Sequence, residues 1–253
     1  MKVLTDTGLV FRRYLAILLH NPWWVAIEVI QPLLYLLLFA PLLKSIAGVP
    51  GFPRGGAYNV FVPGLLIQLG LFSSSGVGFG LIAELRSGVV ERLRVTPISR
   101  LALLLGRACR DVVTIVFQAV VLVLLSLPFG LTLTWQGLLL VLGLLVLIGL
   151  LFSSLAYAVA LALKSEDSYA ALTYTATLPL LLLSGVLLPL SLAPAWLRAI
   201  AAANPLSYAV TAARAIFLND LGQASVVTGV LIMAVLAVLA SAVAARAFGR
   251  AVA

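Results

Sequence analysis

The sequence predicts an all-α integral membrane protein with six transmembrane helices, and its composition and its pattern of apolar stretches lead to that fold class. Hydrophobic residues make up 63% of the 253 residues, charged residues only 9%, and the mean hydropathy is +1.20. A soluble domain is about 45–50% apolar and about 25% charged, so this chain lacks the polar surface that a folded body needs in water. A membrane helix requires about 20 predominantly apolar residues, and six stretches meet that requirement. We expect residues 1–253 to form a single transmembrane domain.

Residues 1–22 precede the first of these stretches and have the pattern of an amphipathic helix. The apolar residues that fall near one helical face are Val3, Val10, Tyr14, Ile17 and Leu18. The charged residues that fall mostly elsewhere are Lys2, Asp6, Arg12 and Arg13. The pattern predicts a helix in the inner membrane interface, ended by Asn21-Pro22 because the residue before a proline disfavours the α region. An alternative is that this segment merely extends the first span.

The six predicted spans are bounded by charges, by Pro or Gly, or by a Trp or Tyr of the interfacial kind. They are approximately Trp24–Leu43, Val60–Ile82, Val112–Leu131, Gly137–Leu163, Tyr169–Leu190 and Ser225–Ala245. Glu28 and Gln31 lie just inside the first span. An unpaired carboxylate is costly there and normally faces protein or water, so we expect Glu28 to have a buried partner.

The distribution of Lys and Arg predicts the orientation. With both termini inside, twelve of the sixteen Lys and Arg residues lie on the inner side, and the other four are Lys44, Arg54, Arg198 and Arg214. Because positive residues concentrate on the cytoplasmic side, we expect a multi-pass protein of the cell membrane with both termini in the cytoplasm. Contact with lipid headgroups is an alternative role for any single arginine.

The segment from Glu84 to Asp111 is the most polar part of the chain and lies between the second and third predicted spans. Its charges alternate in sign, and Thr96-Pro97 ends one short helix and starts another, because proline fits the first turn of a helix but not its interior. We expect a short helix along the inner face that presents Glu and Arg side chains to a soluble partner. A solvated connector is the alternative.

The segment between the fifth and sixth predicted spans has a different character. Pro189, Pro194 and Pro205 interrupt it too often for a span, yet it is too apolar for a free loop. Two short helices over 187–215 that dip into the outer leaflet and break at Asn204-Pro205 would fit. Non-helical backbone at that depth must be buried or line a cavity, so we expect a pathway element here. A structural lid on the bundle is the alternative.

These features, in this order, resemble the type-2 ATP-binding-cassette (ABC) transporter permeases of the multidrug, lipid and polysaccharide export type. The resemblance covers essentially the whole chain, including VVERLRVTPISRLALLLGR between spans two and three and SGVLLPLSLAPAWLRAIAAANPLSY before the last span. Its most specific pieces are Glu91-Arg92-Leu93 with Thr96-Pro97 and Arg100, and the series Pro194, Trp196-Leu197, Asn204-Pro205, Tyr208 and Arg214.

The resemblance implies an export permease that pairs with a second permease copy or homologue and with two cytosolic ABC ATPase subunits, which carry ATP and Mg. No G-x-x-x-x-G-K-[ST] phosphate loop occurs in the chain, so we expect no cofactor on this chain, no enzymatic activity of its own, and ATP hydrolysis by the partner. A single Cys and a single His argue against a metal centre. The arginines lie beside apolar spans rather than along one polar face, which argues against nucleic acid.

The resemblance also implies roles for two sets of residues, and the polar residues of the spans add a third. The expected coupling helix lies within 84–100 and its residues are Glu84, Arg86, Glu91, Arg92, Arg94, Thr96, Pro97 and Arg100. The expected outer re-entrant gate comprises Pro189, Pro194, Trp196, Asn204, Pro205, Tyr208 and Arg214. The candidate pathway residues are Gln68, Ser73, Ser74, Tyr169, Thr173 and Thr177, although helix packing is an equal explanation for these hydroxyl and amide groups.

The expected cargo is an amphiphilic drug, lipid or glycan, because a charged sugar polymer would need more aromatic and polar lining than the spans offer. Two other functional classes remain open. An ion- or proton-coupled transporter needs ionisable residues near the middle of its spans, and only Glu28 approaches that position. A membrane-embedded enzyme needs paired catalytic groups, which the scarcity of His and of intramembrane Asp and Glu disfavours.

Overall fold

The computed structural model describes residues 2–20, 23–46, 56–89, 100–187 and 189–251, and within them every regular element is a helix. The helices are α1 (Lys2–His20), α2 (Trp23–Ile46), α3 (Gly56–Arg86), α5 (Arg100–Ser126), α6 (Trp135–Leu163), α7 (Glu166–Leu182), α8 (Ala195–Ala201), α9 (Pro205–Phe217) and α10 (Ala224–Ala251). Two short 3₁₀ turns cover Leu127–Phe129 and Leu190–Leu192. The predicted all-α fold is therefore confirmed for the described residues.

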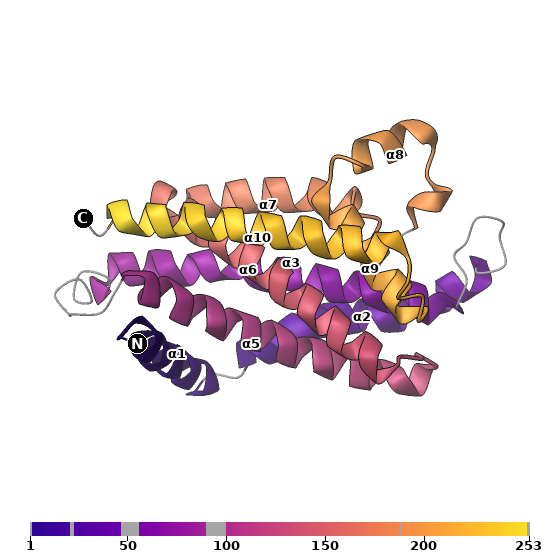
Figure 1. Ribbon diagram of the computed structural model, residues 1–253, viewed down its shortest axis with the longest axis horizontal. Helices are drawn as coiled ribbons and strands as arrows, with labels where there is room; N and C mark the ends of the chain where they lie inside the picture. Colours follow the sequence, from indigo (N-terminus) through magenta and orange to yellow (C-terminus); the bar gives the residue numbers. More distant parts are fainter. Residues whose placement is uncertain (1, 21–22, 47–55, 90–99, 188, 252–253) are drawn as a thin grey trace.

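The long helices run along the long axis of the molecule, and α8 projects from one end of the bundle (Figure 1). The start of α1 and the end of α10 both lie towards the opposite end (Figure 1). Helix α6 packs against both α3 and α10, α2 packs against α3, and α1 packs against α5. We call the end with the termini the inner end, in line with the predicted orientation.

Four helices in the described part of the chain are long and apolar enough to cross a membrane, namely Gly56–Arg86, Ala102–Phe129, Trp135–Leu163 and Ala224–Gly249. These contain the predicted second, third, fourth and sixth spans, apart from the last residues of the third. In α2 the described side chains give only the shorter apolar stretch Val29–Leu38. Helix α7 has 17 residues. The six-span count therefore stays a prediction.

The predicted fifth span, Tyr169–Leu190, is longer than the helix that the structure shows. Helix α7 begins at Glu166, where Ser165 caps it by accepting a bond from the Ser168 amide, and ends at Leu182. The chain then turns at Gly185, whose φ of 78° lies in the left-handed region. Glycine adopts this conformation without the steric cost that a side chain brings, so the helix stops although the sequence remains apolar.

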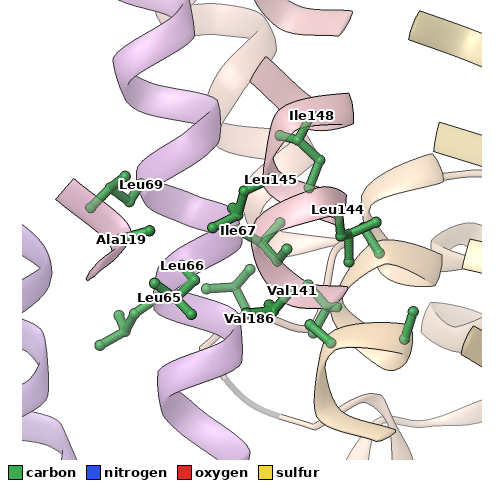
Figure 2. Close-up of a cluster of buried hydrophobic side chains, with 14 of the residues drawn as sticks. Leu65, Leu66, Ile67, Leu69, Ala119, Val141, Leu144, Leu145, Ile148 and Val186 are labelled. Atoms are coloured by element: carbon green, nitrogen blue, oxygen red, sulfur yellow. The ribbon is translucent and has the colours of Figure 1, made fainter. Parts of the chain in front are cut away.

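The main hydrophobic core surrounds the middle of α3. Leu65, Leu66 and Ile67 have no exposed surface, and they belong to one cluster with side chains of α5 and α6 (Figure 2). Val186, from the chain after α7, joins the same cluster. Lipid tails are as apolar as these side chains, so close van der Waals packing rather than removal from water stabilises these contacts. Helix α3 is thereby the central helix of the bundle.

Helix α1 lies against α5, and a glycine permits their close approach. Val10 and Tyr14 of α1 are buried with Leu103 of α5. A Cβ atom added at Gly106 would lie 2.5 Å from Val10 Cγ1, closer than two carbon atoms can pack. Ile17, predicted on the same apolar face, is instead 56% exposed, because it lies beyond this contact and borders a cavity of about 360 Å³. Of the predicted apolar face, Val10 and Tyr14 are thus buried against α5, whereas Ile17 is not covered by other helices.

Candidate functional site

A group of buried and partly buried ionisable and phenolic side chains lies at the inner end of the bundle. We call it the inner polar cluster, and its members are Tyr14 on α1, Glu84 on α3, Arg107, Arg110 and Asp111 on α5, and Tyr157 on α6. A charge in so apolar a setting is stable only when it is paired and hydrogen-bonded. The cluster contains two arginines and two carboxylates, so its formal charges balance.

Glu84 joins three helices in this cluster. Its Oε2 atom accepts a hydrogen bond of 2.8 Å from the Tyr14 hydroxyl and another from Nη2 of Arg107. The Arg107 side chain is 4% exposed and that of Glu84 is 23% exposed. The Arg107 guanidinium also lies 4.7 Å from the centroid of the Tyr14 ring, within reach of a cation–π interaction. Helix α1 is thus attached to both α3 and α5 by one carboxylate and one guanidinium.

The electrostatics of Tyr14 keep it a hydrogen-bond donor. Burial raises the pKa of the Tyr14 hydroxyl to about 12, with Glu84 adding to the increase and Arg107 opposing it. A neutral phenol donates a proton to the Glu84 carboxylate, whereas a phenolate would repel it. The contact between α1 and α3 is therefore intact throughout the physiological pH range.

Asp111 forms the second half of the cluster. It is 2% exposed, accepts a hydrogen bond from the Tyr157 hydroxyl, and pairs with Nη2 of Arg110 at 2.9 Å. The Tyr157 ring in turn meets Phe248 of α10 edge to face, with centroids 6.3 Å apart. These contacts tie α5 to α6 and α10 one turn away from the Glu84 contacts. The inner ends of five helices therefore meet through polar and aromatic side chains.

The expected coupling residues are only partly within the described structure. Glu84 faces α1 and α5, as above, and Arg86 makes an exposed ion pair of 3.1 Å with Glu166 at the start of α7. Arg100 begins α5. The remaining expected residues, Glu91, Arg92, Arg94, Thr96 and Pro97, lie outside the described residues, and so does the predicted break between short helices. Their role toward a soluble partner stays a prediction.

Sequence reasoning missed the partners that Glu84 and Asp111 have within the bundle. Arg107 and Arg110 counted only as positive charge on the inner side, and Tyr14 only as part of an apolar face. A usable signal was present, because three charged residues, Arg107, Arg110 and Asp111, lie within five positions directly before the predicted third span. Charges so placed are expensive unless they pair.

At the opposite end, Arg214 of α9 connects three segments. Its Nε donates to the Val60 carbonyl of α3 at 2.9 Å, and its Nη2 donates to the Gly185 carbonyl after α7 at 2.7 Å. The chain passes close to α3 here, since a Cβ atom on Gly64 would lie 2.6 Å from the Val186 carbonyl oxygen. One guanidinium therefore holds the end of α7 and the start of α3 against α9.

Asn204, between α8 and α9, also connects two segments through hydrogen bonds to the backbone. Its Oδ1 accepts from the Leu206 amide at 3.0 Å and so caps α9, and its Nδ2 donates to the Leu180 carbonyl at 2.7 Å. Carbonyls in the last turn of a helix lack an intrahelical partner, so Asn204 satisfies one that the end of α7 leaves free. Tyr208 closes the turn by donating to the Ala202 carbonyl at 3.0 Å.

The other expected gate residues have simpler environments. Pro205 is the first residue of α9, a position that suits proline. Pro189 is buried, whereas Pro194 and Trp196 are exposed on the projecting α8 segment. The structure thus has two short helices on either side of the Asn204 region, and their insertion into the membrane stays a prediction.

The candidate pathway residues fall into two separate places. Gln68 and Ser73 border a cavity of about 610 Å³ between α2 and α3. Tyr169, Thr173 and Thr177 border a cavity of about 240 Å³ between α3, α6 and α7. Ser74 donates to the Gly70 carbonyl of its own helix at 2.6 Å. The structure does not bring the predicted set together, and the side chain of Glu28, for which a buried partner is expected, is outside the described part.

Comparison with known proteins identifies the family. The profile of the family described as ABC-2 type transporter matches residues 5–218. The transport permease ycf38 of Porphyra purpurea is 31% identical over 203 residues, which cover 79% of this chain and 69% of the relative. The daunorubicin resistance ABC transporter permease protein DrrB1 of Streptomyces coeruleorubidus is 30% identical over 205 residues, covering 77% of this chain and 69% of that protein. This chain therefore belongs to the ABC-2 type transporter family of membrane permeases, as the sequence motifs predict.

Proposed function

We propose that this chain is the permease subunit of an ATP-driven exporter that works with a second permease copy and two separate cytosolic ATPase subunits. The family match over residues 5–218 supports transport. The observation that carries the coupling step is the Glu84–Arg107 contact, because it joins the two helices that flank residues 90–99. A partner that engages residues 90–99 would act on both helices at once.

The inner polar cluster makes those helices a mechanical unit. Helix α3 ends at Arg86 and α5 begins at Arg100. A displacement of the chain between them would therefore displace the end of α3 and the start of α5 together. An exposed ion pair such as Arg86–Glu166 contributes only about 0–1 kcal/mol. Breaking a buried charged pair costs about 3–5 kcal/mol. The helices α1, α3 and α5 therefore move together between inward- and outward-accessible packings of the permease pair.

The proposed location is the cell membrane, with both termini and the inner polar cluster on the cytoplasmic side. The positive-inside distribution of Lys and Arg supports this orientation. The placement of the α1 start and the α10 end at one end of the bundle agrees with it (Figure 1). The ends of α3 and α5 that flank residues 90–99 are then on the side of a cytosolic ATPase.

The proposed cargo is an amphiphilic drug, lipid or glycan that enters from the cytoplasmic side or the inner leaflet. A relative whose name denotes daunorubicin resistance supports the drug class. The apolar lining of the cavity of about 610 Å³ between α2 and α3 also favours a largely apolar molecule.

The test is ATPase stimulation in a reconstituted complex. The permease is co-expressed with a candidate ABC ATPase subunit, purified and placed in liposomes, and ATP hydrolysis is measured. We expect the double variant Glu91→Lys with Arg92→Glu to abolish stimulation while the protein still inserts, with a reporter after Ala253 accessible from the cytoplasmic side. The matched control reverses two exposed charges at the α6–α7 turn, Lys164→Glu with Asp167→Lys, and should retain stimulation.

Two outcomes would contradict this function. Unchanged ATPase stimulation in the Glu91/Arg92 variant would remove the coupling segment from the proposal. Transport that continues without the ATPase and follows a proton gradient would instead favour the ion-coupled class.

A further inference from the structure

Helix α3 contains a segment of low helix propensity in its inner half. Residues 73–80 read SSSGVGFG and include three serines and three glycines, yet α3 is continuous from Gly56 to Arg86. Glycine is the least favourable residue in a helix interior apart from proline, because it loses the most backbone entropy on folding. The backbone of residues 73–80 is therefore easier to bend than a stretch of ordinary helix-forming residues.

This segment is also more loosely packed than the outer half of α3. All residues from Val60 to Leu71 are buried, whereas Gly76 and Gly80 are exposed. A cavity of about 550 Å³ borders both of these glycines. The cavity of about 240 Å³ between α3, α6 and α7 borders Ser75. The segment therefore has free space beside it, which the close-packed outer half of the helix lacks.

Three carbonyls of α3 near this segment accept hydrogen bonds from side chains. The Ser74 hydroxyl donates to the Gly70 carbonyl at 2.6 Å, and the Ser75 hydroxyl donates to the Leu71 carbonyl at 2.7 Å. The Tyr169 hydroxyl of α7 donates to the Ser75 carbonyl at 2.6 Å. In an α-helix each carbonyl also pairs with the amide four residues ahead. These three carbonyls therefore keep a donor if the backbone bond opens, which is the condition under which a membrane helix tolerates a break.

The bond from Tyr169 differs from the two serine bonds because it comes from another helix. The Tyr169 side chain is 1% exposed, and its ring meets Phe79 edge to face with centroids 4.8 Å apart. Gly78 makes room for this ring, since a Cβ atom there would overlap it. Helix α7 thus places a hydroxyl against the Ser75 carbonyl, whose helical partner is the amide of Phe79.

The two ends of α3 are held by different parts of the molecule. On the outer side of the segment, α3 lies in the main hydrophobic core, and Arg214 of α9 binds its backbone. On the inner side, Glu84 connects α3 to α1 and α5. A bend at residues 76–80 would therefore let the inner part of α3 tilt with α1 and the start of α5 while the outer part stays in the core.

We infer that α3 bends at residues 76–80 during transport and that Tyr169 is a positioning residue for this bend. When the bond between the Ser75 carbonyl and the Phe79 amide opens, the Tyr169 hydroxyl still donates to that carbonyl. A local shift to a π-type hydrogen bond satisfies the freed amide. The assignment of the bend to the transport cycle rests on the proposed function.

The hinge is tested by amide hydrogen exchange of the permease alone in lipid nanodiscs, without ATPase or ATP. We expect the amides of residues 76–80 to exchange faster than those of residues 60–71. The variant Gly80→Ala adds a methyl group that meets no atom within 4 Å. It should slow exchange in the segment by about 4- to 5-fold and raise the Tm by about 2–4 °C, because alanine is the better helix former.

The variant Tyr169→Phe distinguishes a positioning role from a structural one. It keeps the ring but removes the donor, so the Ser75 carbonyl has a partner in the closed helix and none when the helix opens. Exchange at residues 76–80 should therefore become slower, by about 2- to 10-fold for one hydrogen bond. A bond that only fastens α7 to α3 would give the opposite sign. The control Tyr208→Phe removes another bond from a phenol to a carbonyl and should leave exchange in α3 unchanged.

The link to transport is tested in the reconstituted complex with the ATPase. Gly80→Ala should lower ATPase stimulation by about 4- to 5-fold, because the stiffer helix bends less often. The matched control is Gly143→Ala, which adds a methyl group at another helical glycine with no atom within 4 Å, on α6. This control should raise the Tm by a similar amount and leave both α3 exchange and ATPase stimulation unchanged.

Three results would overturn the inference. Exchange at residues 76–80 as slow as at residues 60–71 in the wild type would exclude a weak point in α3. Faster exchange in Tyr169→Phe would show that the hydroxyl only fastens α7 to α3. Equal ATPase stimulation in Gly80→Ala and Gly143→Ala would exclude the bend from transport. A wild-type complex without any ATPase stimulation would instead contradict the proposed function, while exchange in the permease alone still decides whether the hinge exists.

Discussion

Replacing Glu84 by alanine is the most direct way to test whether the inner polar cluster holds α1, α3 and α5 together. The variant leaves the Arg107 guanidinium, on a side chain that is only 4% exposed, without its carboxylate, and it removes the acceptor of the Tyr14 hydroxyl. Stranding a buried charge costs about 3–5 kcal/mol, and the lost hydrogen bond adds about 0.5–1.5 kcal/mol.

Glu84 is 23% exposed, so water can reach the vacated site and solvate the Arg107 guanidinium in part. The expected loss of stability is therefore smaller than the sum of these two costs. We therefore expect a loss of about 3–4 kcal/mol, which corresponds to a fall in Tm of about 6–16 °C at about 2–4 °C per kcal/mol for a chain of this size. The assay is thermal unfolding in detergent, followed by tryptophan fluorescence, in a double-mutant cycle with Arg107→Met, which keeps an apolar stem of similar length.

The cycle has a defined expectation and a matched control. Glu84→Ala combined with Arg107→Met should be more stable than Glu84→Ala alone, because no unpaired charge then remains. The control, Glu166→Ala, breaks the exposed pair with Arg86 and should cost only about 0–1 kcal/mol. A Glu84→Ala variant that unfolds at the same temperature as Glu166→Ala would refute the assignment of Glu84 as a buried link between helices.

Two further predictions concern single contacts at the two ends of the bundle. Asn204→Ala should lower stability by about 1–3 kcal/mol, because it removes the cap of α9 and leaves the Leu180 carbonyl without its partner. Asn204→Ser keeps a neutral capping oxygen but does not reach the Leu180 carbonyl, so it should lose less, and equal losses in both variants would contradict the capping role. Burial raises the pKa of Tyr14 to about 12 from an ordinary value of 10.0, so the stabilisation from its neutral form is complete below pH 10 and is lost as the pH rises through about 12. Tyr14→Phe should therefore lose stability less steeply than the wild type between about pH 10 and 12 in the same unfolding assay, and parallel curves would exclude Tyr14 as the titrating group.

The sequence predicts the helical fold well because membrane helices need long apolar stretches, and such stretches are visible without any knowledge of contacts. Helix α6, for example, begins within two residues of its predicted start and ends at the predicted Leu163. The fifth span was predicted too long, because apolarity continues beyond Leu182 while the backbone turns at Gly185. Hydropathy reports the surroundings of a residue and not its backbone conformation.

The inner polar cluster was not predictable in the same way. The Tyr14–Glu84 contact spans 70 positions of sequence and the Glu84–Arg107 contact spans 23, so neither is visible as a local pattern. The hydroxyl residues illustrate the opposite difficulty. Ser74 looks like a pathway group in sequence, yet its hydroxyl donates to a carbonyl one turn back in α3, which satisfies it internally, and the neighbouring Ser75 does the same. The sequence therefore identifies polar residues in the spans. It does not distinguish one whose hydrogen bond is made within its own helix from one such as Gln68, whose buried amide has no hydrogen-bond partner among the described residues.

The Arg214 contacts have a consequence for how this protein tolerates sequence change. Its three hydrogen-bond acceptors are all backbone carbonyls, those of Val60, Gly185 and Val186, and every amino acid supplies the same carbonyl. The side chain at position 60 is therefore free to vary as far as this contact is concerned, whereas position 214 requires the planar, multi-donor group that lysine lacks. Substitutions that accumulate around such a contact need no compensating change on the other side, so related chains could preserve the arrangement while sharing few of the surrounding residues.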